Sequence, residues 1–246
     1  MRPRLGVWVV SMTLLSGCQK KPESAVKKDE NATLMMASDR GDLSRVQQLL
    51  REGVDVNERT SNGETALHYA AQSKNVLVVQ ALIQAGADVN VKMTGDVTPL
   101  MRSLDMAFGQ PDIAFALIHA GADVNAADEN GDTPLIIATT ESSFEVFQSL
   151  LDRGANPNVR GLNGDTALHY AAMNAILDRA KLLLEHGADP TIHNSAGKVP
   201  YDIAESTNAD KLVQAKFLEM RNLLSQASRQ MPQRISNPTG SPSTSH

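Results

Sequence analysis

The chain has 246 residues, of which 41% are hydrophobic and 4% aromatic, and its formal net charge is −5 at pH 7. This length allows one large domain or two small ones. Because the net charge is negative, the chain lacks the excess of basic residues that nucleic-acid binding requires, and we expect no nucleic-acid partner. A single cysteine excludes an intramolecular disulfide and argues against a cysteine-based metal site.

Residues 1–17 have the pattern of a secretory signal peptide. A basic start with two arginines is followed by a mostly apolar run over 5–15 and by the small residues Ser16 and Gly17. The apolar run is shorter than the ~20 residues that a membrane-spanning helix needs. We therefore expect this segment to be removed from the mature protein.

The residues Leu15-Ser16-Gly17-Cys18 resemble the lipobox of bacterial lipoproteins. In that family the cysteine thiol receives a diacylglyceryl group, the signal is cut before the cysteine, and the new amino terminus is acylated, for example with palmitate. The resemblance implies cleavage between Gly17 and Cys18 and lipidation of Cys18; the alternative is an inert thiol in a chance pattern. Gln19 stands where an aspartate retains enterobacterial lipoproteins in the inner membrane, so the resemblance favours the outer membrane, with the protein facing the periplasm.

Residues 18–31 are charged and poor in apolar side chains, which predicts a flexible tether. Its lysines could contact anionic headgroups, but a solvated linker is the simpler and preferred explanation. At the other end of the chain, residues 229–246 are rich in Pro, Ser and Thr and predict a disordered tail.

A 33-residue period fills the segment between them. The motif GVDVN and its variants begin at Gly53, Gly86, Gly121, Gly154 and Gly187. The motif TALH or TPLM begins at Thr65, Thr98, Thr133 and Thr166, with a degenerate VPYD at Val199. Apolar residues at helical spacing lie between the two motifs, so each unit predicts two helices: the threonine caps the first, and the glycine ends the second in a left-handed conformation.

These motifs resemble the ankyrin repeat, with its 33-residue period and its T-P-L-H-x-A signature. The resemblance implies an all-α ankyrin-repeat solenoid over 32–228, with about five repeats and a C-terminal capping helix over roughly 209–226. The third repeat departs from the pattern. It has two extra residues within 102–111, and Met101-Arg102-Ser103-Leu104 replaces His-x-Ala-Ala. The insertion is either neutral drift or a binding feature.

No metalloprotease, serine-hydrolase, P-loop or dinucleotide motif is present, so we predict no catalytic residue, no metal site and no cofactor, and a protein that is not an enzyme. His68 and His169 occupy the same place in the TALH motif, where the resemblance implies structural hydrogen bonds between repeats. Asp88, Asp123 and Asp189 recur with the period and predict turns rather than an acid–base pair.

Ankyrin solenoids recognise protein partners on a concave surface built from turn tips and the inner face of the first helices. By that resemblance the partner-binding positions are Ser61, Asn62, Glu64, Gln72, Ser73, Val97, Asp105, Met106, Glu129, Asp132, Thr140, Glu141, Leu162, Asp165, Met173 and Asn174. The acidic members would attract a basic partner, and the Met and Leu members would supply adaptable apolar contact. The plainer alternative is a merely solvated face.

Three functional hypotheses follow. The first is an immunity lipoprotein that neutralises a toxin effector in the periplasm, such as a phospholipase of a type VI secretion system, as some bacterial ankyrin-repeat lipoproteins do. The second is a scaffold or chaperone-like partner of an envelope or periplasmic stress-response protein. The third is an enzyme of unknown type, which the missing motifs disfavour. In the first two hypotheses the protein has a protein partner, a membrane anchor through lipid, and a monomeric state when unbound.

Overall fold

The computed structural model describes residues 33–104, 111–206 and 211–236. All regular structure in these residues is helical, and the predicted all-α class is confirmed. The predicted signal peptide, the lipidation site and the tether lie outside the described residues. None of the described helices is both long and apolar enough to cross a bilayer.

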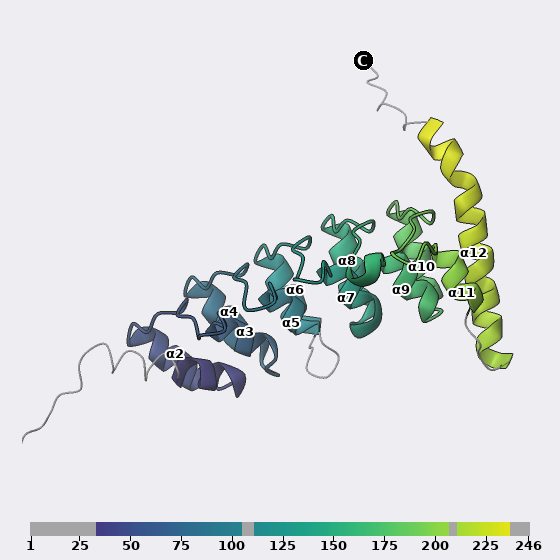
Figure 1. The fold of residues 1–246 in the computed structure, drawn as a ribbon. Helices are drawn as coiled ribbons and strands as arrows, with labels where there is room; N and C mark the ends of the chain where they lie inside the picture. Colours follow the sequence, from purple (N-terminus) through teal and green to yellow (C-terminus); the bar gives the residue numbers. More distant parts are fainter. Residues whose placement is uncertain (1–32, 105–110, 207–210, 237–246) are drawn as a thin grey trace, which may run out of the picture.

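The helices come in pairs, one pair for each repeat (Figure 1). In chain order the pairs are residues 33–39 with α2 (Leu43–Arg51), α3 (Ala66–Ala71) with α4 (Val76–Gln84), α5 (Pro99–Ser103) with α6 (Pro111–His119), α7 (Pro134–Glu141) with α8 (Phe144–Asp152), α9 (Ala167–Met173) with α10 (Leu177–Glu185), and α11 (Pro200–Ser206) with α12 (Lys211–Ser236). A short 3-10 turn, η1 (Leu162–Gly164), precedes α9.

The pairs stack into two layers. The first helices α3, α5, α7, α9 and α11 contact one another in sequence, and the second helices from α2 to α12 do the same. The result is an elongated solenoid whose C-terminal end is covered by α12 (Figure 1). The capping helix continues to Ser236, past the predicted end near 226: residues 224–231 contain no glycine or proline that would stop it, and the helix also runs on through Pro232.

The ends of the helices follow the predicted local chemistry. The side chain of Thr98 accepts a hydrogen bond from the amide of Met101, and that of Thr133 accepts one from Ile136. A proline follows each of these threonines at the start of the helix, where no amide donor is missed. The five glycines that follow the second helices have φ between +81° and +88°, which confirms their left-handed conformation.

The repeats approach closely because the first helices carry small side chains on their packed faces. Ala70, Ala71, Ala171 and Ala172 are all fully buried. Repeat three places Ser103 and Leu104 at the equivalent positions, and both are buried as well. The core is therefore continuous along the stack, as expected for units that cannot bury their apolar faces alone.

An asparagine ladder joins consecutive second-helix turns. The amide nitrogen of Asn125 donates to the carbonyl of Gly154 at 3.1 Å, and its side-chain oxygen accepts from the backbone N–H of Asn156 at 2.8 Å. Asn57, Asn90 and Asn158 make the same two bonds to their own next repeats. Each asparagine thus satisfies one backbone acceptor and one donor that the turn leaves unpaired.

Replacing Asn125 by alanine should lower the free energy of unfolding by about 1–3 kcal/mol, because two backbone groups lose their partners. Urea denaturation followed by circular dichroism measures this change. Asn130→Ala is the matched control, since Asn130 is exposed at a turn tip and only its backbone N–H is hydrogen-bonded, to Asp128. Equal loss in both variants would contradict the ladder's role.

Candidate protein-binding surface

The turn tips that precede the first helices form a hydrogen-bonded ridge along the solenoid. The N–H of Thr94 donates to the carbonyl of Asn62 at 2.8 Å, and the N–H of Glu129 donates to that of Gly95 at 2.9 Å. Between repeats four and five the link uses a side chain, because the N–H of Leu162 donates to Asp132 Oδ1 at 3.0 Å. The ridge is therefore held in place before any partner arrives.

A row of exposed or partly exposed side chains runs beside this ridge, at one position of every first helix. Its members are Met36, Tyr69, Arg102, Ile137, Tyr170 and Ile203. Neighbouring first helices contact each other, so equivalent positions lie side by side. We call this row together with the tip residues the inner face. Tyr, Arg and Met are residue types enriched at protein–protein interfaces.

Repeats two and three share a polar network on the inner face. The Tyr69 hydroxyl donates to Glu64 Oε2 at 2.8 Å. Arg102 donates to the side-chain oxygen of Gln72, and its guanidinium lies 3.7 Å from Glu64 Oε1. Arg102, one of the atypical residues of repeat three, thus compensates the charge of Glu64 from the neighbouring repeat.

Repeats four and five instead gather carboxylates around Tyr170. Burial raises the pKa of Asp132 above its ordinary value, and Asp128 and Asp165 raise it further, while the bond from the Leu162 N–H opposes the shift. Burial and the same three carboxylates raise the pKa of Tyr170. Asp165 itself is buried and accepts a bond from the side chain of Asn194 at 2.7 Å.

The two repeat histidines, His68 and His169, make hydrogen bonds between neighbouring repeats, as predicted. The N–H of Thr166 donates to His169 Nδ1 at 3.2 Å, so the other ring nitrogen carries the proton and donates to the carbonyl of Lys198 at 3.1 Å. His68 makes the equivalent bonds to Thr65 and to Val97 in the next repeat. Burial lowers the pKa of both imidazoles, and the bonds to the two carbonyls oppose this shift.

Acidification should therefore destabilise the solenoid. The neutral histidines contribute stability above their ordinary pKa of 6.5, and this contribution is lost as the pH falls through their lowered folded-state values. We expect the urea midpoint to drop between about pH 7.5 and about pH 5.5, with a smaller drop in the double variant His68→Gln, His169→Gln. His186→Gln, at an exposed site, should keep the full dependence; an unchanged slope in the double variant would contradict this account.

The aspartates of the second-helix turns also behave as predicted. Asp88 and Asp123 each accept a bond from the backbone N–H two residues later, at 2.9 Å, and Asp189 does so at 2.8 Å. Among the described residues, no group of three or more His, Cys, Asp or Glu side chains is arranged to hold a metal ion.

The predicted partner-binding residues fall into three groups. Twelve of them are exposed or partly exposed. They are Ser61, Asn62, Glu64, Gln72, Val97, Glu129, Asp132, Thr140, Glu141, Leu162, Met173 and Asn174. Asp105 and Met106, with the third-repeat insertion, lie outside the described residues.

The expectation of an accessible side chain is wrong for Ser73 and Asp165, which are 3% and 6% exposed. Ser73 turns inward to accept a bond from the backbone of Asn75, against Gly41 of the preceding repeat. Asp165 turns toward Asn194 of the following repeat. The sequence-based list contains none of the six residues of the first-helix row. Their repeat spacing of 33 residues is a signal that could have identified them.

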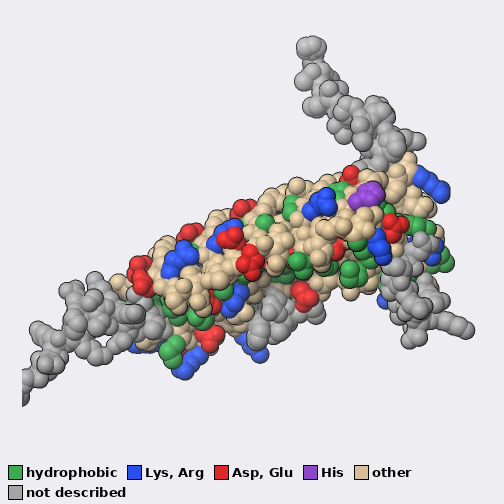
Figure 2. All heavy atoms as spheres, viewed as in Figure 1, with side chains coloured by type: hydrophobic (Ala, Val, Ile, Leu, Met, Phe, Trp, Pro, Cys, Tyr) green, Lys and Arg blue, Asp and Glu red, His purple; other side chains and the backbone are tan. Residues whose placement is uncertain are grey.

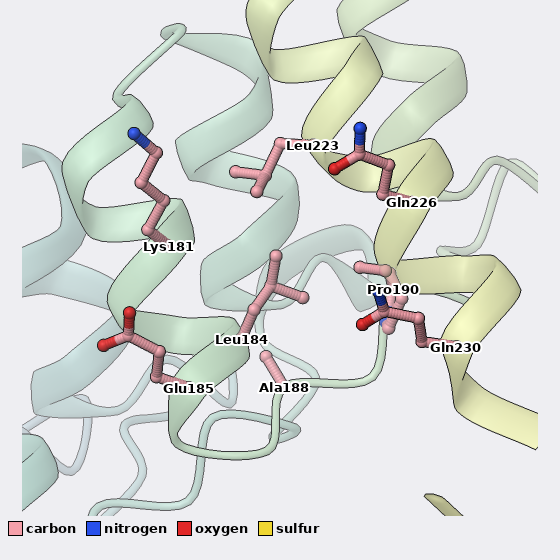
Figure 3. A pocket seen from close by; sticks show the side chains of 9 residues that line it. Lys181, Leu184, Glu185, Ala188, Pro190, Leu223, Gln226 and Gln230 are labelled. Carbon is pink, nitrogen blue, oxygen red and sulfur yellow. The ribbon is translucent and has the colours of Figure 1, made fainter. Parts of the chain in front are cut away.

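Charges of both signs are scattered along the face seen in Figure 2. A separate hollow lies between α10 and α12, with a volume of about 180 Å³, lined by residues such as Leu184, Leu223 and Gln226 (Figure 3). Lys181 and Glu185 are its charged members, and no nucleophile stands beside a base in it.

The fold and the inner face define a helical-repeat binding protein. A family model described as ankyrin repeats (3 copies) matches residues 11–93, 34–128 and 100–194. These matches together span most of the chain, and the protein belongs to the ankyrin-repeat family.

Two relatives of known sequence are similar to part of this chain. Bovine mitochondrial disaggregase is 42% identical over 90 residues, which are 37% of this chain and 13% of that protein. The ankyrin repeat protein YahD of Escherichia coli K12 is 40% identical over 63 residues, which are 26% of this chain and 31% of that protein. The chain thus spans a minor part of each relative.

One solved structure is similar over nearly its whole chain. It is a chain in the complex of the predatory endopeptidase Bd0816 from Bdellovibrio bacteriovorus with the immunity protein Bd3460. The TM-score is 0.66 and the identity 27%, and the match covers 78% of this chain and 96% of that one.

Proposed function

We propose that this protein is a non-enzymatic lipoprotein of the bacterial envelope that binds and neutralises a toxic enzyme. Lipid on Cys18 would anchor it in the outer membrane, with the solenoid facing the periplasm. The partner would be a hydrolase that attacks envelope components, for which a lipase or a peptidase are the two candidates. No step of this function requires a cofactor.

The observation that carries this proposal is the inner face. Its tips are fixed by backbone bonds between repeats, so little conformational entropy is lost when a partner binds. It presents tyrosine, arginine and methionine side chains in one row; all three are enriched at protein interfaces, and tyrosine and arginine are among the types that dominate binding energy there. The likeness to a chain from an endopeptidase–immunity protein complex supports an inhibitory role for such a face.

The anchor supports the same role. A lipobox followed by a charged tether resembles the way lipoproteins hold soluble domains near a membrane. Tethering raises the local concentration of the inhibitor where an envelope-directed enzyme acts. This reasoning applies equally to a lipase and to a peptidase.

The proposal is tested with the secreted hydrolase encoded nearest to this chain's gene. Purified mature chain should abolish its activity at an equimolar ratio, and cells that lack the chain should become sensitive to the hydrolase. A full rescue by the wild-type gene controls for effects on neighbouring genes. Resistant deletion cells and an uninhibited hydrolase would contradict the immunity role, and recovery of a resident envelope protein on the chain would favour the scaffold hypothesis instead.

A further inference from the structure

The two halves of the inner face differ in charge balance. In repeats two and three the carboxylate of Glu64 is paired with Arg102. In repeats four and five, none of Asp128, Asp132 and Asp165 has a lysine or arginine at ion-pair distance within the part of the chain that the structure describes. The sequence of this half is also acidic, since residues 128–173 contain seven acidic residues and two basic ones, Arg153 and Arg160.

The C-terminal half also exposes apolar side chains next to these carboxylates. Leu162, at the tip of repeat five, is 45% exposed, and Met173, at the end of α9, is 43% exposed. Met173 lies three residues after Tyr170 on α9, so the two side chains share one face of the helix. Leu162 lies beside Asp132, because its N–H donates to that carboxylate.

We propose that repeats four and five bind a loop of the protein partner that presents a lysine or arginine next to a large apolar side chain. This rests on the proposed function as a protein-binding module and specifies the chemistry of its partner. The cation lies against the ring of Tyr170 and pairs with Asp132, while the apolar side chain covers Leu162 and Met173. Asp165 is buried and adds to the negative field without touching the partner.

Charge complementarity decides in favour of this occupant. A cation over a tyrosine ring is attracted by the ring itself, and the attraction grows when nearby carboxylates are unpaired and partly desolvated. An acidic loop would meet repulsion from three carboxylates at the same place. A purely apolar loop would leave Asp132 further desolvated and unpaired, which costs free energy.

One substitution should weaken partner binding without lowering the stability of the fold. Asp132→Asn keeps an oxygen that can accept from the Leu162 N–H but removes the partly buried charge. The variant should unfold at the same or higher urea concentration than the wild type. Its affinity for the partner should nevertheless fall, because the cation loses its counter-charge.

The test is selection of a phage-displayed library of random cyclic peptides on the mature chain. Enriched peptides should carry Lys or Arg beside a large apolar residue, should bind Asp132→Asn and Leu162→Ser at least about tenfold more weakly, and should lose affinity as salt is added. Glu185→Gln, which removes one exposed charge from the outer layer, is the matched control and should bind normally. Enrichment of acidic peptides, or equal binding to all variants, would overturn the proposal.

This outcome is separable from that of the proposed function. If the hydrolase is neutralised by the wild type and equally by Asp132→Asn and Leu162→Ser, the protein is an inhibitor that uses another part of the inner face. The binding function then stands and the basic-loop proposal fails.

Discussion

Replacing Arg179 by methionine should lower the free energy of unfolding by about 3–5 kcal/mol, the largest stability loss that we expect from any single side chain. Arg179, on α10, is 91% buried, as its exposed fraction is 9%. It donates to the carbonyls of Ala138 at 2.6 Å, of Thr139 and of Ser142, which end α7 in the preceding repeat. Its guanidinium carbon also lies 5.4 Å from the centre of the Phe147 ring.

The physical reason is that one side chain donates to three carbonyls at a helix end, of which that of Ala138 also accepts a bond from the Ser142 hydroxyl, at 3.2 Å. The last carbonyls of a helix have no partner within the helix, and a cation there also meets the negative end of the helix dipole. Methionine fills a similar volume but donates no hydrogen bond. Urea denaturation gives the overall loss, and hydrogen exchange should show it concentrated in α7 and α8.

Lys181→Met is the control for this experiment, because Lys181 is an exposed cation on the same helix. It should leave the unfolding midpoint almost unchanged. A loss of less than about 1 kcal/mol in Arg179→Met would mean that water replaces the guanidinium at these carbonyls and that the fold does not require the Arg179 hydrogen bonds.

Replacing Cys18 by serine should abolish membrane attachment. A serine hydroxyl cannot take the thioether-linked diacylglyceryl group, so the chain would have no acyl chain, and each buried CH₂ of such chains contributes about 0.8 kcal/mol to membrane affinity. Fractionation of cells expressing the variant should find it outside the membrane pellet or as unprocessed precursor. Metabolic labelling with a fatty-acid analogue should mark the wild type alone.

A control at a neighbouring position keeps this experiment specific. Lys21→Ser changes the tether but leaves the lipobox intact, and it should remain in the membrane fraction. Equal membrane recovery and equal labelling of Cys18→Ser and the wild type would show that Cys18 is an inert thiol and would remove the anchor from the proposed function.

The repeat period made most of the fold predictable. Two motifs in register placed the helix starts at threonines and the helix ends at glycines, and the structure has both where the motifs stand. Local chemistry decides these features, since a capping threonine and a left-handed glycine act within a few residues of themselves. The end of α12 was less predictable, because residues 224–231 carry no strong stop signal and the helix runs on past Pro232.

Arg179 shows where the repeat pattern was informative but was not used. Counting back eight residues from the glycine after α4, α6, α8 and α10 gives Val78, Ile113 and Val146, which are all at most 1% exposed, and then Arg179; the same count in α2 gives Arg45, which is partly exposed. A charged residue at a core position predicts a specific set of acceptors. Those acceptors belong to α7, some forty residues earlier, so their identity depends on packing between repeats and cannot be read from local sequence.

The inner face could be predicted only in part, because contacts between residues far apart in the sequence decide which of its side chains are accessible. Tip residues are exposed by the geometry of a tight turn, and Leu162 is exposed and Asp132 partly exposed in the structure. Ser73 and Asp165 share a repeat position with exposed residues, but both are buried and hydrogen-bonded, Ser73 to Asn75 in its own repeat and Asp165 to Asn194 in the next. Which member of a repeated position makes such a bond depends on the residues packed around it.

Photo-crosslinking in living cells tests the central claim, that the inner face binds a protein partner. A photoreactive amino acid is placed at Met173 on the inner face or at Lys181 in the outer layer of the same repeat, two exposed positions on adjacent helices. After irradiation we predict a covalent adduct of one defined mass at position 173 and none at position 181. Adducts at position 181 alone, or none at position 173 while the partner is expressed, would contradict it.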